Sequence, residues 1–533
     1  MGAKFGSRKK TVFNRLKERY VFSYLRHLLG SFKKVRTLEG ESGILAILNE
    51  LQNHKIPISY PLLRWMLPKK VRPIFEINLR QKLLRDLLET GLSSAIMLSR
   101  GGSNFKTILP VPQSWQIFLE KNSVFLNKFS SIYFVYYIFL KFREGLSEIF
   151  ELLCRYEKSP ASAEAAVLIG FPPAAVAILS NEKIKLRNFI SWVREKFNQK
   201  EYWIIGQEQR KISDTVLESR YPFPSLNRLK KIKFVMRSLF LTVKVMIAGI
   251  LGQWTLLYLF KELVDYYYVE CLQAEDLPSL FIFSNSCYIY RPLWTHLAEE
   301  RGSEIRLLFY ATNTYNVKLA IGDYGLMPGY GIMTWPIYHT FHQNHAKFLE
   351  EILQAKVKIY VEESPIPLED SEDKLEMPEC KKIALFDVQP FKESFMAKIG
   401  RPTSLYTFAI SKTIFEDLQA WCQENNILLI IKPKRGVGKR LCPKYFRMLK
   451  QLRLLSYVKI AYSQCSPERI CEQVDAVICQ PFTSAALFAS AKRIPVAYYD
   501  PTHIFLKEQP ACQGVPVLQG KVELNDWLSR VMQ

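Results

Sequence analysis

The sequence predicts an α/β protein with two Rossmann-like domains preceded by a mainly helical N-terminal region. Three observations lead to this fold class. Between residues 380 and 533, apolar runs of strand length alternate with longer segments of helix length. A shorter series of the same kind begins near residue 277, whereas the first 270 residues mostly show helical spacing. The chain of 533 residues also exceeds what one hydrophobic core supports.

The composition excludes a mainly disordered chain and points to an anionic partner. Hydrophobic residues make up 48% of the chain and the formal net charge is +23, with the excess concentrated in residues 1–37 and 183–244. Such a charge attracts anionic lipid, phosphorylated substrates or nucleic acid. The sequence shows no motif of a nucleic-acid-binding module, so we expect an anionic membrane surface and a phosphorylated substrate as partners and no nucleic acid.

Cysteine usage and targeting signals indicate a cytoplasmic protein. The ten cysteines include no Cys-x-x-Cys pair, which is typical of reduced thiols. The N-terminus lacks the apolar segment of a signal peptide, and Gly6 stands where a myristoylation motif requires Ser or Thr. Residues 245–260 carry no charge but are shorter than the roughly 20 residues of a membrane span. A buried helix, an interfacial helix and a span all remain open for this segment. We expect a protein that is peripheral on the inner face of the plasma membrane.

Residues 1–270 are expected to form the basic, mainly helical region. Leu83 and Leu87 belong to an apolar stripe with the spacing of an amphipathic helix. Residues 125–156 have a helical pattern with many aromatic side chains. This helix would either pack in a core or lie with its aromatic face on lipid headgroups.

Residues 271–361 are expected to form the first Rossmann-like domain. Strands at 280–284 and 304–311 flank a helix at 292–301, and a βαβ unit of this kind requires parallel strands. Residues 337–355 are predicted to form a further helix.

Residues 362–379 are rich in Pro, Glu, Asp and Ser and are predicted to be a linker. Residues 380–533 then form the second Rossmann-like domain, in which strands and helices alternate throughout. The predicted strands are 382–388, 426–432, 457–461, 476–479 and 494–499, and the predicted helices include 411–425, 444–455 and 483–492.

Two segments that follow strands of the second domain carry side chains suited to a phosphate-bearing ligand. Thr483 and Ser484 open a helix, where backbone N–H groups and hydroxyls can bind an anion. Lys432, Lys434 and Arg435 leave the end of another strand. Because ligands bind at the carboxyl ends of parallel strands, we expect the two segments to lie side by side. An ordinary helix cap and a solvated basic turn are the alternatives.

Four motifs support a more specific prediction: Ser466-Pro467, Asp-Ala-Val-Ile at 475–478, Pro-Phe-Thr-Ser at 481–484, and Ile-Pro-Val-Ala-Tyr-Tyr-Asp-Pro at 494–501. In these motifs the chain resembles the bacterial surface-polysaccharide biosynthesis proteins named for their Pro-Phe-Thr-Ser motif. The C-terminal part of those proteins is similar to glycosyltransferases of the GT-B fold. The resemblance is specific over about residues 427–501 and does not extend to the first 270.

The resemblance implies a nucleotide-sugar donor in the second domain, as a substrate with no resident cofactor or metal, and a glycan or lipid-linked acceptor on the first domain. Related transferases often have a His-Pro pair where this chain has Lys434-Arg435, which leaves the type of donor open. The predicted donor-binding residues are Lys432, Lys434, Arg435, Ser466, Pro481, Phe482, Thr483, Ser484 and Asp500.

An inverting transferase also requires a general base near the acceptor hydroxyl. The candidates are Asp323, which equally fits an ordinary turn beside Gly322, and His339. His339, His342 and His345 follow one another at three-residue steps, but two such steps in a helix rotate the third side chain away from the first, so we expect no metal site there.

The sequence therefore predicts a glycosyltransferase that moves a sugar from a nucleotide-activated donor to a growing cell-surface polysaccharide. The alternatives are a polyol-phosphate transferase that uses a CDP-activated donor and a non-catalytic polysaccharide assembly protein.

Overall fold

The computed structural model describes the chain from residue 24 onward. The description leaves out residues 25, 32, 35–37, 59–63, 65, 156–163, 172–188, 207–209, 212–215, 310–316, 321, 324–325, 354–356, 363–376, 401–404, 435–437, 439 and 464. Most of the predicted linker and the basic N-terminal segment therefore lie outside the described residues.

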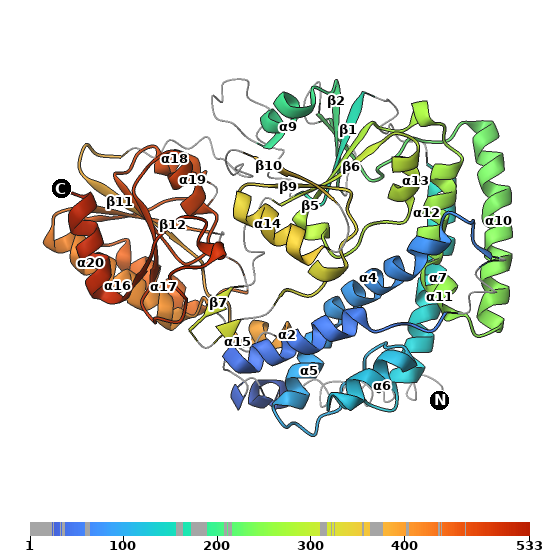
Figure 1. Cartoon of the computed structure of the whole chain (residues 1–533), viewed down its shortest axis with the longest axis horizontal. Helices are drawn as coiled ribbons and strands as arrows, with labels where there is room; N and C mark the ends of the chain where they lie inside the picture. The colour runs from blue at the N-terminus through green and yellow to red at the C-terminus, as the bar shows by residue number, and fades with distance from the viewer. Residues whose placement is uncertain are drawn as a thin grey trace, which may run out of the picture.

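Helices dominate the N-terminal part, as predicted (Figure 1). Most of them pack on one face of the first sheet, whereas Trp192 and Val193 of the helix Phe189–Phe197 pack on the opposite face. Their buried faces follow the expected spacing, with Leu83 and Leu87 of α4 fully inaccessible. The helices are α2 (Leu38–Asn53), α4 (Arg72–Thr90), α5 (Leu92–Arg100), α6 (Gln113–Lys121), α7 (Ser130–Leu153), α9 (Phe189–Phe197), α10 (Arg228–Ile250), α11 (Trp254–Tyr258) and α12 (Phe260–Glu270).

The first sheet has the strand order β10-β9-β6-β5-β1-β2-β4-β3, in which only β3 is antiparallel to its neighbour. Its strands are β1 (Ala165–Ile169), β2 (Glu201–Ile205), β3 (Arg210–Lys211), β4 (Val216–Ser219), β5 (Leu280–Ser284), β6 (Glu304–Leu308), β9 (Ile337–Thr340) and β10 (Lys358–Val361). Between residues 280 and 361, two α-helices follow strands of this sheet, α13 (Trp294–Glu300) and α14 (Gln343–Ile352). A small hairpin joins β7 (Lys318–Leu319) to β8 (Gly322–Asp323).

This sheet corrects the predicted boundary at residue 271, because four of its strands lie between residues 165 and 219. The helices and the first sheet also share one hydrophobic core, in which Phe75 of α4, Val167 of β1 and Phe281 of β5 all belong to the same cluster. The first Rossmann-like domain thus draws on both predicted segments. Sequence reasoning missed β1 and β2 because a short apolar run buried on both faces has no distinctive periodicity.

The second sheet is entirely parallel, with the order β13-β12-β11-β14-β15-β16. Its strands are β11 (Lys382–Asp387), β12 (Leu428–Pro433), β13 (Val458–Ile460), β14 (Ala476–Cys479), β15 (Val496–Asp500) and β16 (Val517–Gln519). Its helices are α15 (Glu393–Lys398), α16 (Phe408–Glu424), α17 (Pro443–Leu452), α18 (Pro467–Cys471), α19 (Ala485–Ala491) and α20 (Gly520–Val531). The predicted strands and helices of this domain are confirmed, and β16 is added to them.

Alternate residues of the second sheet face two separate cores. Ala384 and Phe386 of β11 pack in one cluster, whereas Ile383 and Leu385 pack in another on the opposite face. Burial on both faces explains why these strands are continuous apolar runs in the sequence. The two parallel sheets with flanking helices confirm the predicted pair of Rossmann-like domains of the GT-B fold (Figure 1).

The hairpin β7–β8 connects the two domains. Its Leu319 forms a β-bridge with Phe505 of the second domain, and Ala320 N–H donates to the Ile504 carbonyl at 3.0 Å. Ser94 of α5 also donates a hydrogen bond to the Ala397 carbonyl at 3.2 Å.

The uncharged segment 245–260 is divided among three helices. It contains the end of α10, the turn at Gly252 with a φ of 76°, all of α11 and the start of α12. Among the described residues, no helix is both long and apolar enough to cross a membrane. The helix predicted over residues 337–355 is also corrected, since β9 and α14 occupy that range.

Candidate functional site

The strand order of the second domain places the Pro-Phe-Thr-Ser motif at the point where the direction of winding reverses. In chain order the sheet reads 3-2-1-4-5-6, so the chain leaves β11 and β14 in opposite directions. Open α/β sheets bind ligands in the crevice outside the carboxyl ends of such a pair of strands. Residues 481–484 follow directly after β14 and therefore border this crevice.

Phe482 gives the motif its shape. Its φ is 63°, in the left-handed region that bulky residues rarely adopt. The ring is held between Tyr498 and Phe505, with centroids at 5.6 Å and 5.0 Å. Tyr406 fixes the preceding residue by donating to the Pro481 carbonyl at 3.2 Å. Backbone strain of this kind persists only where the surroundings enforce it, and it gathers at functional sites.

The two hydroxyls of the motif have different environments. Thr483 is buried, and its Oγ1 donates to the Gln480 carbonyl at 3.1 Å. Ser484 is half-buried at the N-cap of α19, where in the described structure its side chain makes no capping hydrogen bond. Thr483 thus supports the turn, whereas the Ser484 side chain is half-buried and makes no capping hydrogen bond in the described structure.

A buried carboxylate ends β11 beside the motif. The Asp387 carboxylate accepts a hydrogen bond from the Tyr445 hydroxyl of α17. Burial raises the pKa of Asp387 to about 7, although Tyr445 and the Lys432 ammonium both favour its ionised form. Lys432, buried on β12, is paired in register with Phe386, the residue before Asp387.

Gln480 joins the ends of β11 and β14. Its backbone N–H donates to the Phe386 carbonyl at 3.2 Å, and its side-chain Oε1 accepts from Val388 N–H at 2.5 Å. Neither Gln480 nor Asp387 is among the residues that the sequence predicts for the site. The signal for Asp387 was its position as a lone acid at the end of an apolar strand.

The structure brings the basic and hydroxyl-bearing segments to the same edge of the sheet. The cationic segment follows β12 and the motif follows β14, and only β11 lies between these strands. Strands are spaced by about 4.8 Å, so the two segments start roughly 10 Å apart. Lys434 is half-buried, and Arg435 lies outside the described residues.

Two other predicted donor residues are engaged within the fold. Ser466 is buried and caps α18 by accepting from Glu468 N–H at 3.2 Å. The buried Asp500 carboxylate accepts from the Thr502 N–H and hydroxyl, at 3.0 and 2.7 Å, and from Phe505 N–H at 3.0 Å. Asp500 therefore shapes the loop that contacts the first domain through Phe505.

His339 occupies a core position. It is fully buried on β9, where Nδ1 lies 2.7 Å from Glu362 Oε1 and Nε2 lies 2.9 Å from Arg306 Nη1. Burial lowers the pKa of His339, against the opposing effect of Glu362. Both ring nitrogens are engaged, so the structure does not place His339 where a substrate could reach it. Asp323 belongs to β8, and its side chain lies outside the described residues.

The first domain has its own polar hollow of about 650 Å³ at the carboxyl ends of β1, β2 and β5. Lys261 Nζ lies 3.0 Å from both Glu148 Oε2 and Asp265 Oδ2 on its wall. Burial raises the pKa of Asp265 to about 8, despite the attraction of Lys261. Asp265 Oδ1 is buried without a hydrogen-bond partner among the described residues, so it could accept a hydrogen bond from a ligand.

The chain has a distant similarity to several solved structures. The UDP-GlcNAc 2-epimerase of Methanocaldococcus jannaschii is 9% identical, with a TM-score of 0.34 over 69% of this chain and 92% of that chain. The sucrose-phosphate synthase of Thermosynechococcus elongatus is 11% identical, with a TM-score of 0.35 over 69% and 89%. The α,α-trehalose-phosphate synthase (UDP-forming) of Burkholderia xenovorans is 8% identical, with a TM-score of 0.31 over 69% and 92%.

A comparison with curated proteins gives no significant match in sequence. Residues 241–528, more than half of the chain, match the family described as polysaccharide biosynthesis PFTS motif protein. The matched range contains the whole second domain up to α20 and the motif at its switch point. The chain belongs to the polysaccharide biosynthesis PFTS motif family.

Proposed function

We propose that the protein is a glycosyltransferase that uses a nucleotide-activated sugar to extend a cell-surface polysaccharide. The observation that carries the proposal is the convergence of the Pro-Phe-Thr-Ser turn, Lys432 and Asp387 at the β11–β14 switch point. Membership of a polysaccharide biosynthesis family supports the same class of reaction.

In this reaction the bond between the anomeric carbon of the sugar and a phosphate oxygen breaks, and the acceptor hydroxyl forms the new bond to that carbon. The nucleotide leaves with negative charge on its phosphate. Cations and hydroxyl donors fixed beside that oxygen stabilise the developing charge. Lys432, Lys434 and Ser484 are the side chains that would act on the leaving phosphate.

The hollow in the first domain supports an acceptor site that is lined by residues of the first domain, whereas the donor binds to the second. Sugar hydroxyls are hydrogen-bond donors, and Asp265 Oδ1 offers them a buried acceptor without a partner among the described residues. Glu148 and Lys261 add a charged wall that suits a polar glycan. Asp265, which Lys261 holds on the wall of the hollow, is also the candidate general base in place of His339, in the ionised form that predominates above its pKa of about 8.

The proposal is tested by incubating the full chain with a panel of uridine-, guanosine- and cytidine-activated sugars and measuring the nucleotide released. Release of nucleotide from one donor is expected, with a strong reduction in Lys434→Ala. Lys412→Ala is the matched control, because Lys412 is an exposed lysine on α16 in the same domain. No release from any donor, or equal rates in the two variants, would contradict the proposal.

Product analysis distinguishes the polyol-phosphate transferase, which would leave a phosphodiester in the polymer and release CMP from its CDP-activated donor. The observation that favours the second alternative, a non-catalytic assembly protein, is the burial of His339, because the sequence offers few other candidates for a general base. Binding of a nucleotide without turnover in the presence of acceptor glycan would support that alternative.

A further inference from the structure

Helix α10 is apolar on two opposite sides. One side packs into the protein through Phe234, Leu241 and Val245. The other side is exposed, although an exposed helix face in a globular protein is usually polar. The exposed apolar residues on and just after α10 are Leu229, Ile232, Met236, Leu239, Phe240, Val243, Met246, Ile247, Ile250 and Leu251.

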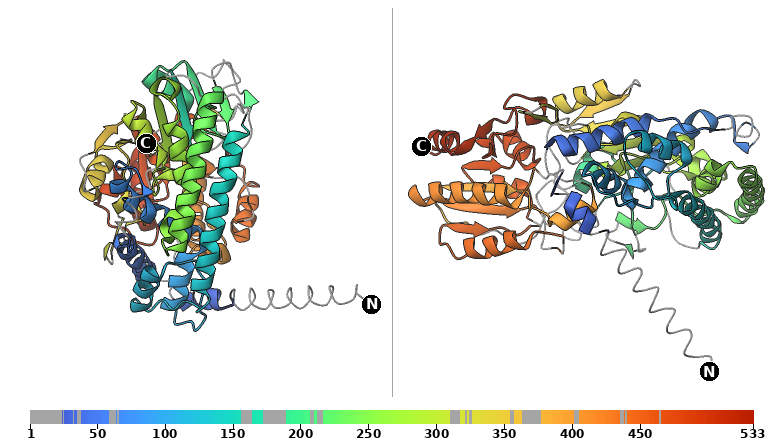
Figure 2. Two further views of the ribbon diagram at one scale, coloured as in Figure 1. Left: turned by 90° about the vertical axis from the view of Figure 1, so that its right-hand side faces the viewer. Right: turned by 90° about the horizontal axis from the view of Figure 1, so that it is seen from below.

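Helix α7 runs antiparallel beside α10 and extends the same surface. Lys231 near the start of α10 donates to the Leu153 carbonyl at the end of α7, at 3.0 Å. Figure 2 shows the long helices side by side on the face of the molecule farthest from the second domain. The exposed apolar residues on and just before α7 are Phe125, Phe129, Ile132, Val135, Tyr136, Phe139, Leu146 and Phe150.

The charge on α10 determines which partner this surface fits. The helix contains six basic residues and no acidic residue. Lys230 and Arg237 pair with Asp276 and Glu270, whereas Arg228 and Lys233 are exposed along the apolar stripe. A second copy of the chain would bring two such basic helices together, and like charges across an interface are unfavourable. An anionic surface is complementary to the helix.

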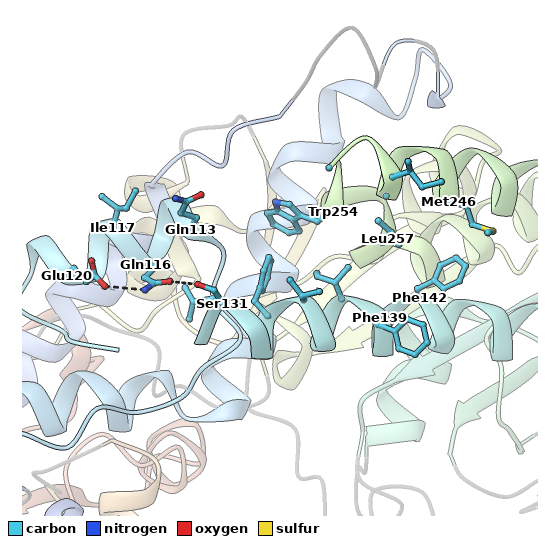
Figure 3. A pocket seen from close by; sticks show the side chains of 17 residues that line it. Gln113, Gln116, Ile117, Glu120, Ser131, Phe139, Phe142, Met246, Trp254 and Leu257 are labelled. Atoms are coloured by element: carbon cyan, nitrogen blue, oxygen red, sulfur yellow. Dashed lines mark hydrogen bonds between the residues drawn. The ribbon is translucent and has the colours of Figure 1, made fainter. Parts of the chain in front are cut away.

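An apolar groove of about 1010 Å³ opens between α6, α7 and the end of α10 (Figure 3). Phe139, Phe142 and Met246 line its apolar end. At the other end, the Gln116 side-chain amide donates a hydrogen bond to Glu120 Oε1 at 3.2 Å and accepts one from the Ser131 hydroxyl at 3.3 Å. A groove with an apolar length and a polar end fits a lipid chain better than a polar ligand.

We propose that the α7–α10 face docks on an anionic phospholipid bilayer, with the apolar side chains in the interfacial layer and one acyl chain in the groove. Interfacial helices have this combination of large apolar side chains and basic residues without spanning the bilayer. Arg228 and Lys233 would contact the anionic headgroups. The proposal concerns binding alone and does not depend on the activity proposed above.

The test is sedimentation of the full chain with vesicles of phosphatidylcholine, with or without phosphatidylglycerol. We expect binding to the anionic vesicles that weakens as salt is raised. Arg228→Glu with Lys233→Glu should reduce the partition constant about tenfold or more. Val135→Asp with Ile250→Asp should reduce it at least as strongly, because both side chains, 70% and 84% exposed, also line the groove.

The matched control is Leu454→Asp with Val522→Asp, which changes two side chains that are 85% and 73% exposed in the second domain. This control should bind like the unmodified chain, and all variants should unfold at the same temperature because the substituted side chains are exposed. Absence of vesicle binding by the unmodified chain, or equal binding by face and control variants, would overturn the proposal. So would a dimer in sedimentation velocity that Val135→Asp with Ile250→Asp dissociates, since a second copy would then cover the face.

Discussion

The Tyr445 hydroxyl donates a hydrogen bond to the Asp387 carboxylate, which is buried at the carboxyl end of β11. Tyr445 comes from α17 and is itself fully buried, so the contact ties a helix on one face of the sheet to the edge that carries the Pro-Phe-Thr-Ser motif. Burial also raises the pKa of Tyr445, so this hydroxyl stays protonated and remains a donor.

Asp387→Asn is predicted to stabilise the protein increasingly as the pH rises. The pKa of Asp387 is raised from 3.8 to about 7 by burial, so the folded state keeps a proton that the unfolded state loses. The stability that this proton provides is complete below the unfolded pKa of 3.8 and is lost as the pH rises to about 7. Thermal unfolding should therefore show a larger gain in Tm for the variant above neutral pH than in mild acid. A gain that is independent of pH would contradict the assignment.

Ser484→Ala is predicted to weaken nucleotide binding, whereas Thr483→Ala is predicted to lower the stability of the protein. Ser484→Ala should leave the free energy of unfolding nearly unchanged and weaken nucleotide binding about five- to tenfold, as loss of a hydrogen bond does. Thr483→Ala should lower the free energy of unfolding by about 1 kcal/mol, because its Oγ1 bonds to the Gln480 carbonyl. Calorimetric titration with the nucleotide and chemical denaturation measure the two effects. Ser490→Ala, at an exposed serine of the same helix, is the control.

Glu362→Gln is predicted to destabilise the first domain near neutral pH. Burial alone would raise the pKa of Glu362, but hydrogen bonds from His339 and Lys196 hold it below its ordinary value. A depressed carboxyl pKa contributes stability above the unfolded value of 4.5, which is lost as the pH falls through the folded pKa. The variant should lose about 1–3 kcal/mol at neutral pH and less in acid. Denaturation at the two pH values checks the prediction. A loss of transferase rate with unchanged stability would instead give His339 a catalytic role.

Asp265→Asn is predicted to reduce transfer of the sugar to the acceptor. Transfer of the sugar to water, which hydrolyses the donor when no acceptor is present, should continue. Asn keeps the size of the side chain but can neither ionise nor take up the proton of the acceptor hydroxyl, so the KM for the acceptor or kcat should change while donor affinity does not. Steady-state kinetics with donor and acceptor varied separately provide the measurement. Equal loss of both activities would instead indicate that Asp265 stabilises the fold and has no specific role toward the acceptor.

Much of the second domain could be predicted because its strands are buried on both faces and its helices have clear starting signals. Pro467 at the first position of α18 and the Ser466 cap are signals of this kind, and the structure contains both. The first domain was harder, since β1 and β2 are five-residue apolar runs within helical surroundings. The prediction of one helix over residues 337–355 was wrong because only two residues separate β9 from α14, so the sequence shows no clear boundary between the strand and the helix.

The sequence by itself determined the fold class, the position of the Pro-Phe-Thr-Ser turn and its neighbourhood with Lys432, because alternating strands and helices restrict the connections of a parallel sheet. Only the tertiary structure decided which predicted site residues use their side chains for hydrogen bonds within the protein. Asp500 accepts a hydrogen bond within its own loop, and His339 is hydrogen-bonded to Glu362, which is distant in sequence. Ser484, by contrast, is half-buried at a helix cap. It also decided that α10 exposes a second apolar side. Burial depends on contacts between distant segments, and local sequence does not specify them.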